Sequence, residues 1–194
     1  MSQTIEQKLW AHQAWLSSDG EEGERLVVEG LQCPAVNWRG SRLAQAMLLD
    51  ANLDGALLST ADLYAANLSG ASMKRAKLDG AILVKAILDQ ARLDGASLAR
   101  TDLRRSSLHD TVLTGADLSG ADLGVAWLSG TDLSRATLDG ATMGEAVIDG
   151  AVLTGASLKE LRGLDTAVVK WVVVDGEELF GAEALVWMKR RAEG

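Results

Sequence analysis

The sequence is poor in the residues that build catalytic and metal centres. It contains one cysteine, Cys33, and two histidines, His12 and His109, among its 194 residues. A single cysteine cannot form a disulfide within the chain, which fits a reducing compartment. One cysteine and two distant histidines are too few for a typical zinc site. The sequence therefore predicts no metal and no cofactor.

Long apolar runs and targeting signals are missing too. The longest apolar run near the C-terminus, 172–174 beside Trp171, is far too short to cross a bilayer. No basic segment followed by an apolar one opens the chain, as it would in a secretory signal peptide. We therefore expect a soluble cytoplasmic protein without a membrane role. The net charge of −8 disfavours direct binding of nucleic acid and favours a protein partner with a basic surface.

Motifs for catalysis do not occur either. The glycines of 19–23 (DGEEG) lack the Gly-Lys-Ser/Thr sequence of a phosphate-binding loop. No nucleophile, base and orienting group cluster in the sequence. His12 falls on an expected helix, where we expect it to pack, and His109 is expected to be solvated. The sequence thus predicts a protein that is not an enzyme.

A five-residue repeat dominates the chain. From Ser41 to Glu160 the frame holds without insertion over 24 pentads, and the third place is leucine in 21 of them. Met73, Met143 and Ile148 fill the other three. The first place is alanine in 19 pentads and a small Ser or Thr in the rest. Internal periodicity of this strictness indicates a repeat architecture.

Neither a straight strand nor an α-helix can bury these leucines together. Side chains alternate along a strand, so residues five apart point to opposite faces. On a helix, five residues advance by about 500°, and the leucines would spiral around the surface. The remaining solution bends the chain once per pentad and directs each leucine towards a common axis. Asp-Gly and Ser-Gly pairs at the fourth and fifth places suit such bends, because tight turns often need a positive φ.

The stretches ANLDGALLSTADLYAANLSGA and ADLSGADLGVA, with their A(D/N)LxG pattern, resemble the pentapeptide repeat family. The resemblance covers 41–160 and implies an all-β solenoid, a right-handed quadrilateral β-helix with four pentads per coil. Val28, Cys33 and Trp38 continue the third place upstream, so six to seven coils are expected. Leucine, rather than a mixture with phenylalanine, implies a uniform interior.

The ends of a solenoid need covering elements. We expect an N-terminal helical cap in 1–25, with a helix over 2–18 that Ser2 or Thr4 caps. The repeat domain spans 26–160. A C-terminal cap in 161–194 contains a strand in 167–176 and a helix in 181–194. Leu185, Trp187 and Met188 are more apolar than a solvated helix needs. In several gyrase-binding family members such a helix joins two rods, so these residues predict either a homodimer contact or packing on the chain's own last coil.

Charge and apolar residues mark the outward-facing places. Eight basic residues against four acids occupy 74–105, and seven acids against Arg135 alone occupy 110–149. If residues twenty apart stack, Asp62, Asp102 and Asp122 share one face, interrupted by Ile82. Met47, Ile87, Trp127 and Val147 share another, on which Trp127 is the strongest candidate for partner contact. The candidate acidic surface comprises Asp110, Asp117, Asp122, Asp132, Asp139 and Asp149.

Two functions remain open for such a rod. Family members that protect DNA gyrase and topoisomerase IV act as DNA mimics, whose carboxylates meet the basic groups of the enzyme's DNA-binding surface. This resemblance implies a role in resistance to topoisomerase poisons, although the basic segment 74–105 does not fit it. The alternative is a general protein-interaction scaffold that uses the apolar column.

Overall fold

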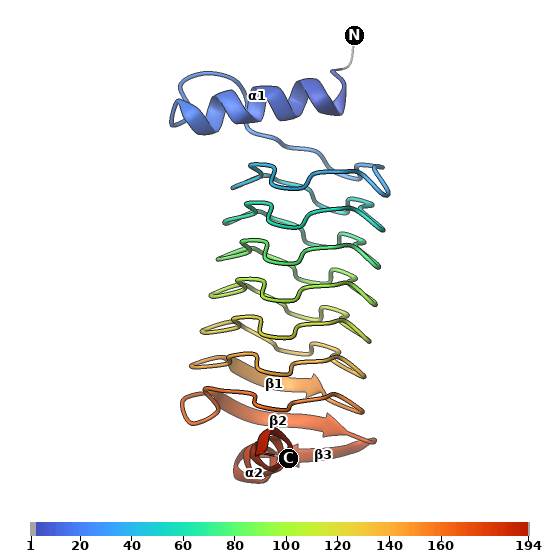
Figure 1. Cartoon of the computed structure of the whole chain (residues 1–194), viewed down its shortest axis with the longest axis vertical. Coiled ribbons are helices and arrows are strands. Elements are labelled where there is room, and N and C mark those ends of the chain that lie inside the picture. The colour runs from blue at the N-terminus through green and yellow to red at the C-terminus, as the bar shows by residue number, and fades with distance from the viewer. Residues whose placement is uncertain (1–2, 194) are drawn as a thin grey trace.

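The computed structural model describes residues 3–193, and most of them wind into a rod of stacked coils (Figure 1). Parallel β-bridges join residues twenty apart, from Val27 with Met47 to Thr142 with Arg162. Four pentads therefore make one coil, and the rod has four sides. We number the sides by the second-place residues of the first coil: Val27 on side 1, Gln32 on side 2, Asn37 on side 3 and Arg42 on side 4.

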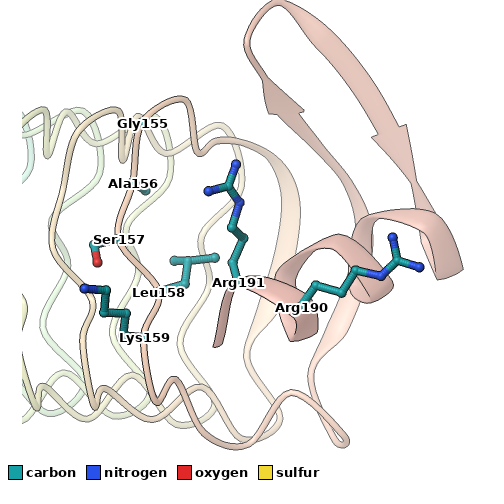
Figure 2. Close-up of a pocket in the computed structure, with 7 residues that line it drawn as sticks. All are labelled: Gly155, Ala156, Ser157, Leu158, Lys159, Arg190 and Arg191. Carbon is teal, nitrogen blue, oxygen red and sulfur yellow. The ribbon is translucent and has the colours of Figure 1, made fainter. Parts of the chain in front are cut away.

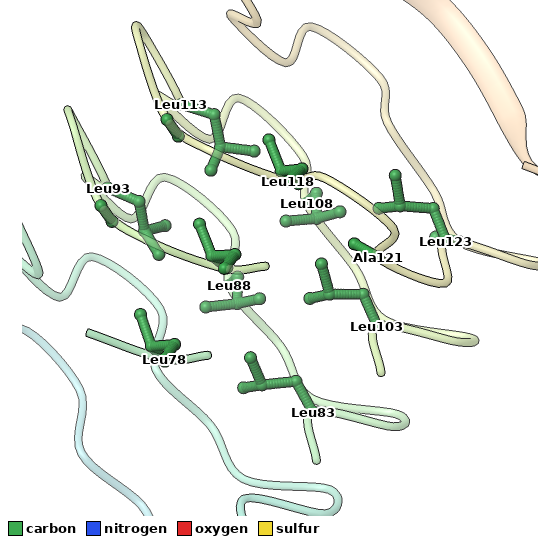
Figure 3. Packing of buried hydrophobic residues seen from close by; sticks show 14 of the residues in the cluster. Leu78, Leu83, Leu88, Leu93, Leu103, Leu108, Leu113, Leu118, Ala121 and Leu123 are labelled. Carbon is green, nitrogen blue, oxygen red and sulfur yellow. The ribbon is translucent and has the colours of Figure 1, made fainter. Parts of the chain in front are cut away.

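The first and third places of the pentads fill the interior. Every third-place side chain from Leu43 to Leu158 is buried. Figure 3 shows leucines of successive coils stacked in rows, such as Leu83, Leu103 and Leu123. Burying one such side chain contributes roughly 1.5–3 kcal/mol. The prediction that the chain hides its leucine column is confirmed.

The small polar residues at buried first places are hydrogen-bonded. The hydroxyl of Thr101 donates to the carbonyl of Leu78, 3.0 Å away on the preceding coil, and Thr111 and Thr131 make the same contact. Because each buried hydroxyl has a hydrogen-bond partner, Ser or Thr can take the place of alanine in the interior at little cost in stability.

The chain turns a corner at the fourth and fifth places. Each first-place amide donates to the third-place carbonyl of the preceding pentad, as Ala46 does to Leu43 at 3.0 Å. Every fifth place from Gly30 to Glu160 has a positive φ, as the second central residue of a type II turn does. Glycine holds fewer than half of these places. Even the β-branched residues Thr60 and Val125 adopt φ values of 58° and 59°, which such residues rarely do.

The second-place Asp or Asn of the repeat satisfies the one amide that the backbone leaves unpaired. Within 43–143, the amides of the other four places donate to backbone carbonyls, and the fourth-place amide does not. The second-place carboxylate or amide oxygen of the same pentad accepts it instead, as Asp62 does from Tyr64 at 3.0 Å and Asp117 does from Ser119 at 2.9 Å. Pairing of this amide within its own pentad thus explains the Asp or Asn of the A(D/N)LxG pattern.

Helix α1, Ile5–Ser17, lies across the N-terminal end of the rod (Figure 1). Thr4 is its N-cap and exchanges hydrogen bonds with Gln7 in a capping box; Ser2, the other predicted cap, lies outside the described residues. His12 is fully buried, and its Nδ1 accepts from the amide of Leu26 at 3.0 Å. This contact ties the helix to the first residue of the first coil.

The C-terminal end carries a three-stranded sheet and a second helix. Strand β1, Val147–Val152, belongs to the last coil and pairs in parallel with β2, Val168–Val174. Strand β3, Glu177–Phe180, returns antiparallel to β2. Both residues of the connecting turn, Asp175 and Gly176, have positive φ values, as a two-residue hairpin turn requires. Helix α2, Gly181–Glu193, follows directly.

Candidate binding surfaces

The described residues offer no obvious site for chemistry. Within 3–193, no group of three or more His, Cys, Asp or Glu side chains could hold a metal ion. His12 is buried under α1, whereas His109 is more than half exposed on a corner of the rod. None of the helices in this part of the chain has the length and apolar character needed to span a membrane. Binding surfaces are therefore the features to compare.

The six candidate acidic residues do not form one surface. The β-bridges place Asp132 on side 2, Asp117 on side 3 and Asp122 on side 4. Asp110 and Asp149 lie at the corner between sides 1 and 2, and Asp139 lies at the corner between sides 3 and 4. The acids thus surround the rod, as the twenty-residue stacking already implies, because these positions belong to different pentads of a coil.

Most of these carboxylates are engaged within the protein. Asp117, Asp122 and Asp132 accept from the fourth-place amides of their own pentads. Asp139 accepts from the hydroxyl of Ser157 and from the amide of Lys159, on the next coil. Such bonds fix the carboxylates close to the backbone, where they support the turns.

The hydrogen bonds also lower two carboxyl pKa values. The bond from Lys170 Nζ, 2.6 Å from the carboxylate, holds the pKa of Asp149 below its ordinary value. Burial raises the pKa of Asp132, but the bonds from Ser134 and Thr114 outweigh it, so this pKa is also lowered. Asp110 differs from the others, because its carboxylate accepts no hydrogen bond from the residues of 3–193. It lies 3.3 Å from His109 Nε2 and packs on Gly130 of the next coil. It is the carboxylate most available to a partner.

The predicted apolar column is present on side 1. Successive bridges connect Met47, Asn67, Ile87, Ser107, Trp127 and Val147, so the four predicted residues align. Two polar residues interrupt them, which the sequence interpretation left out. Trp127 is 59% exposed and dominates the column, while Ile87 is 37% exposed.

Exposed apolar side chains gather on one half of the rod. Along the described coils and β2, the large exposed ones all lie on sides 1 and 4 or on the corner between them, and sides 2 and 3 have none: Val27, Tyr64, Ile82, Ile87, Val125, Trp127 and Val168. Tyr64 and Val125 were not predicted. The twenty-residue stacking, applied to the fourth and fifth places, could have found them.

Helix α2 turns part of its apolar face towards the rod. Met188 is fully buried, so it packs against the chain's own core in this protomer. Leu185 and Trp187 are half-buried against the same core. The large exposed apolar residues of β3 and α2 are Phe180 and Val186, which were not predicted. A shallow hollow of about 400 Å³ lies on this outer face, between β3 and α2.

A second hollow, of about 440 Å³, separates α2 from the last coil (Figure 2). Lys159, Arg190 and Arg191 line it, which suggests an anion site at first sight. Figure 2 shows, however, that the three charged ends point in different directions. Because the cations do not converge on one point, the hollow lacks the geometry of an anion site.

Comparisons with known proteins agree with the coiled architecture. A family model described as pentapeptide repeats matches residues 58–95, 86–124 and 126–160, with eight copies. No curated protein matches the chain. The chain is similar to the crystal structure of HetL, a pentapeptide repeat protein involved in heterocyst differentiation regulation from the cyanobacterium Nostoc. That match has 28% identity and a TM-score of 0.56, and it covers 76% of this chain and 78% of HetL.

Two further solved structures are similar to parts of this chain. QnrB1, a plasmid-mediated fluoroquinolone resistance protein, has 14% identity and a TM-score of 0.49, over 78% of this chain and 92% of that one. A pentapeptide repeat protein from the Arabidopsis thaliana thylakoid lumen has 28% identity and a TM-score of 0.29, over 64% of this chain and 69% of that one. Neither the family model nor the HetL match indicates an enzyme family.

Proposed function

This chain belongs to the pentapeptide repeat family of right-handed β-helices, and we propose that it is a non-catalytic rod that binds a protein partner through side 1. The observation that carries this proposal is the one-sided distribution of exposed apolar side chains. A solvated surface has no physical reason to collect them on two adjacent sides and to leave the other two without them. Exposed tryptophan in such a patch is the residue type that most often anchors a protein interface.

Site-specific cross-linking tests this function directly. A photo-reactive amino acid replaces Trp127 on side 1, and the same residue replaces Val112 on side 2 as the matched control. Both positions are second places of the repeat, so neither change enters the core. We expect cross-links to a defined protein from position 127 and not from 112, in the cytoplasm that the sequence predicts. Equal products from both positions would reject side 1 as the binding surface.

The rod's ends are proposed to act as caps, with α1 covering the first coil and α2 covering the last. We also propose a homodimer through the outer face of α2, where Val186 is 48% exposed and Phe180 is 56% exposed. Met188 takes no part in it, because it is buried within the protomer. Sedimentation of a Val186→Glu variant tests this assembly. A sedimentation coefficient equal to that of the unchanged protein, with both in the monomer range, would contradict the dimer.

A DNA mimic that binds gyrase or topoisomerase IV is the second candidate, and the excess of acids over 110–149 favours it. Protection against topoisomerase poisons, and hence antibiotic resistance, would follow. Asp110 gives the cleanest test, because its carboxylate supports no turn. We expect Asp110→Lys to weaken inhibition of gyrase supercoiling and to keep the fold, since Lys85 already occupies a fifth place. Absence of any effect of the unchanged protein on supercoiling would exclude this candidate.

A further inference from the structure

The corner between sides 4 and 1 combines exposed apolar side chains with cations. Its fifth-place residues stack in the order Ala65, Lys85, Arg105, Val125 and Glu145, one coil apart. Lys85 and Arg105 are therefore separated by a single strand spacing of about 4.8 Å along the rod axis. Val125 follows on the next coil, and Trp127 lies two residues beyond it on side 1.

The cations of this corner differ in how far they are neutralised. Arg104 contacts the carboxylates of Asp102, at 2.6 Å, and Asp122, at 3.7 Å. Lys85 donates to the hydroxyl of Tyr64 at 2.9 Å and lies 5.4 Å from the centre of its ring. Both contacts leave the ammonium without a carboxylate. Arg105 is exposed and forms no ion pair with any residue of 3–193.

We propose that this corner and the adjoining part of side 1 bind an acidic segment of the partner protein. Carboxylates of the segment meet Lys85 and Arg105, and its apolar side chains pack on Val125 and Trp127. This inference rests on the proposed function, because it names the chemistry of the partner for the same surface. Charge complementarity of this kind contributes mainly to specificity and to the rate of association.

Cations on the opposite corner lack this combination. Arg75 and Arg135 occupy fifth places at the corner between sides 2 and 3, where the described side chains include no large exposed apolar residue. A nucleic-acid strand also fits poorly at the corner between sides 4 and 1. It carries a phosphate at every nucleotide, so it would extend beyond the two cations to Asp102, Asp122 or Glu145. A short protein segment with two carboxylates matches the two unneutralised charges.

Two labelled synthetic peptides test the proposal with the full-length chain. Both carry the same phenylalanine and leucine residues, and the residues between them are glutamate in one peptide and lysine in the other. Fluorescence anisotropy measures their binding. We expect the glutamate peptide to bind, with an affinity that falls as salt is added, and the lysine peptide not to bind. Equal binding of both, binding of neither, or displacement of the glutamate peptide by a single-stranded oligonucleotide would overturn the inference.

Matched variants locate the site. Arg105→Glu is compared with Arg135→Glu, which changes the same place of the repeat on the opposite corner, at φ values of 60° and 57°. Glutamate already fills this place at Glu145 and Glu160, so both variants should fold, and thermal melting checks this. We expect Arg105→Glu to weaken the glutamate peptide at least tenfold and Arg135→Glu to weaken it less than twofold. Equal losses of affinity in the two variants would show that only the net charge of the protein matters, and this would overturn the inference.

The variants also separate this inference from the proposed function. If a partner cross-links at position 127 and its binding is unaffected by Arg105→Glu, the proposed function stands. The inference that the partner contributes an acidic segment is then wrong. Failure of the cross-link itself, together with no peptide binding, would remove both.

Discussion

The regular coils of 46–160 and the first coil of 26–45 share a hydrogen-bond ladder but differ in what fills them. In the regular coils, alanine or a small residue occupies the first place and a fully buried side chain the third. In the first coil, Leu26, Leu31 and Val36 occupy first places, and Val28 and Cys33 at third places are only half-buried. A coil between two others needs identical layers, whereas a coil beneath a helix needs larger, irregular side chains.

The difference also changes how each part is stabilised. A regular coil makes the same contacts with the coils above and below it. Its stability therefore comes from interfaces that recur along the rod. The first coil depends on individual contacts with α1, such as the hydrogen bond between His12 and Leu26 and that between Arg42 and Ser17 at 3.0 Å. Substitutions should therefore have different effects in the two parts.

The largest expected difference concerns an acid placed inside each part. Leu118→Asp buries an unpaired charge in a fully closed layer and should cost about 4 kcal/mol or more. Cys33→Asp, at a third place of the first coil, should cost much less, because its side chain reaches solvent. Urea unfolding followed by circular dichroism measures both. Similar losses would show that the first coil is as closed as the others.

A pH change should loosen the first coil and leave the regular coils intact. Burial lowers the pKa of His12 below its ordinary value of 6.5, and the charges of Arg25 and Arg42 act in the same direction. His12 is therefore neutral in the fold, and its contribution is complete above pH 6.5. It is lost as the pH falls below 6.5, because the unfolded state then binds a proton that the fold resists.

Amide hydrogen exchange at pH 7.5 and at pH 5.5 measures this effect. Protection of the Leu26 amide and of α1 should decrease at the lower pH, and protection within 46–160 should not. His12→Asn is the control, since its side-chain oxygen can accept from the Leu26 amide without titrating. Equal loss of protection in this variant would show that His12 is not responsible.

The same contrast separates what the sequence could predict from what it could not. A strict repeat such as that around Leu118 fixes the position of each side chain in a coil, because every layer has the same neighbours. The column that contains Trp127 could be predicted because residues twenty positions apart stack on the same side of the rod. The hydrogen bond of His12 and the burial of Met188 depend on how a helix lies on one end of the rod, and no repeat encodes that. The six candidate carboxylates do not form one acidic surface. Some of them, such as that of Asp117, are hydrogen-bonded within the turns of their own pentads.

The acceptor of the fourth-place amide gives a smaller contrast. Asp117 accepts from Ser119 at 2.9 Å, whereas Asn37, at the same place and side in the first coil, accepts from Arg39 at 3.4 Å. Asp117→Ala should cost about 1 kcal/mol, since it leaves an amide unpaired, and Asn37→Ala should cost less. Thermal melting of both variants checks this. A larger loss for Asn37→Ala would contradict the account of the repeat given by its hydrogen bonds.

The smallest expected effect concerns the strained corners, where a substitution should increase the stability of the fold. Valine is poorly suited to the positive φ of Val125, and this conformation costs about 1–2 kcal/mol in a residue with a side chain. Glycine removes that strain but adds about 0.4–1 kcal/mol of unfolded-state entropy. Val125→Gly should therefore stabilise the rod by about 0.5–1 kcal/mol, while Ala35→Gly in the first coil should change stability by less than about 0.5 kcal/mol, because alanine is less strained. Chemical denaturation measures both.

Strained backbone positions cluster at binding sites in many proteins. On the corner between sides 4 and 1, the proposed contact with the partner would give Val125 such a role. Val125→Gly should thus gain stability and bind the glutamate peptide several-fold more weakly, the exchange of stability for function expected at a binding site. Ala35→Gly lies at the corner between sides 2 and 3 and should leave peptide binding unchanged. If Val125→Gly and the unchanged protein bound the peptide with equal affinity, peptide binding would not explain the strained valine at this corner.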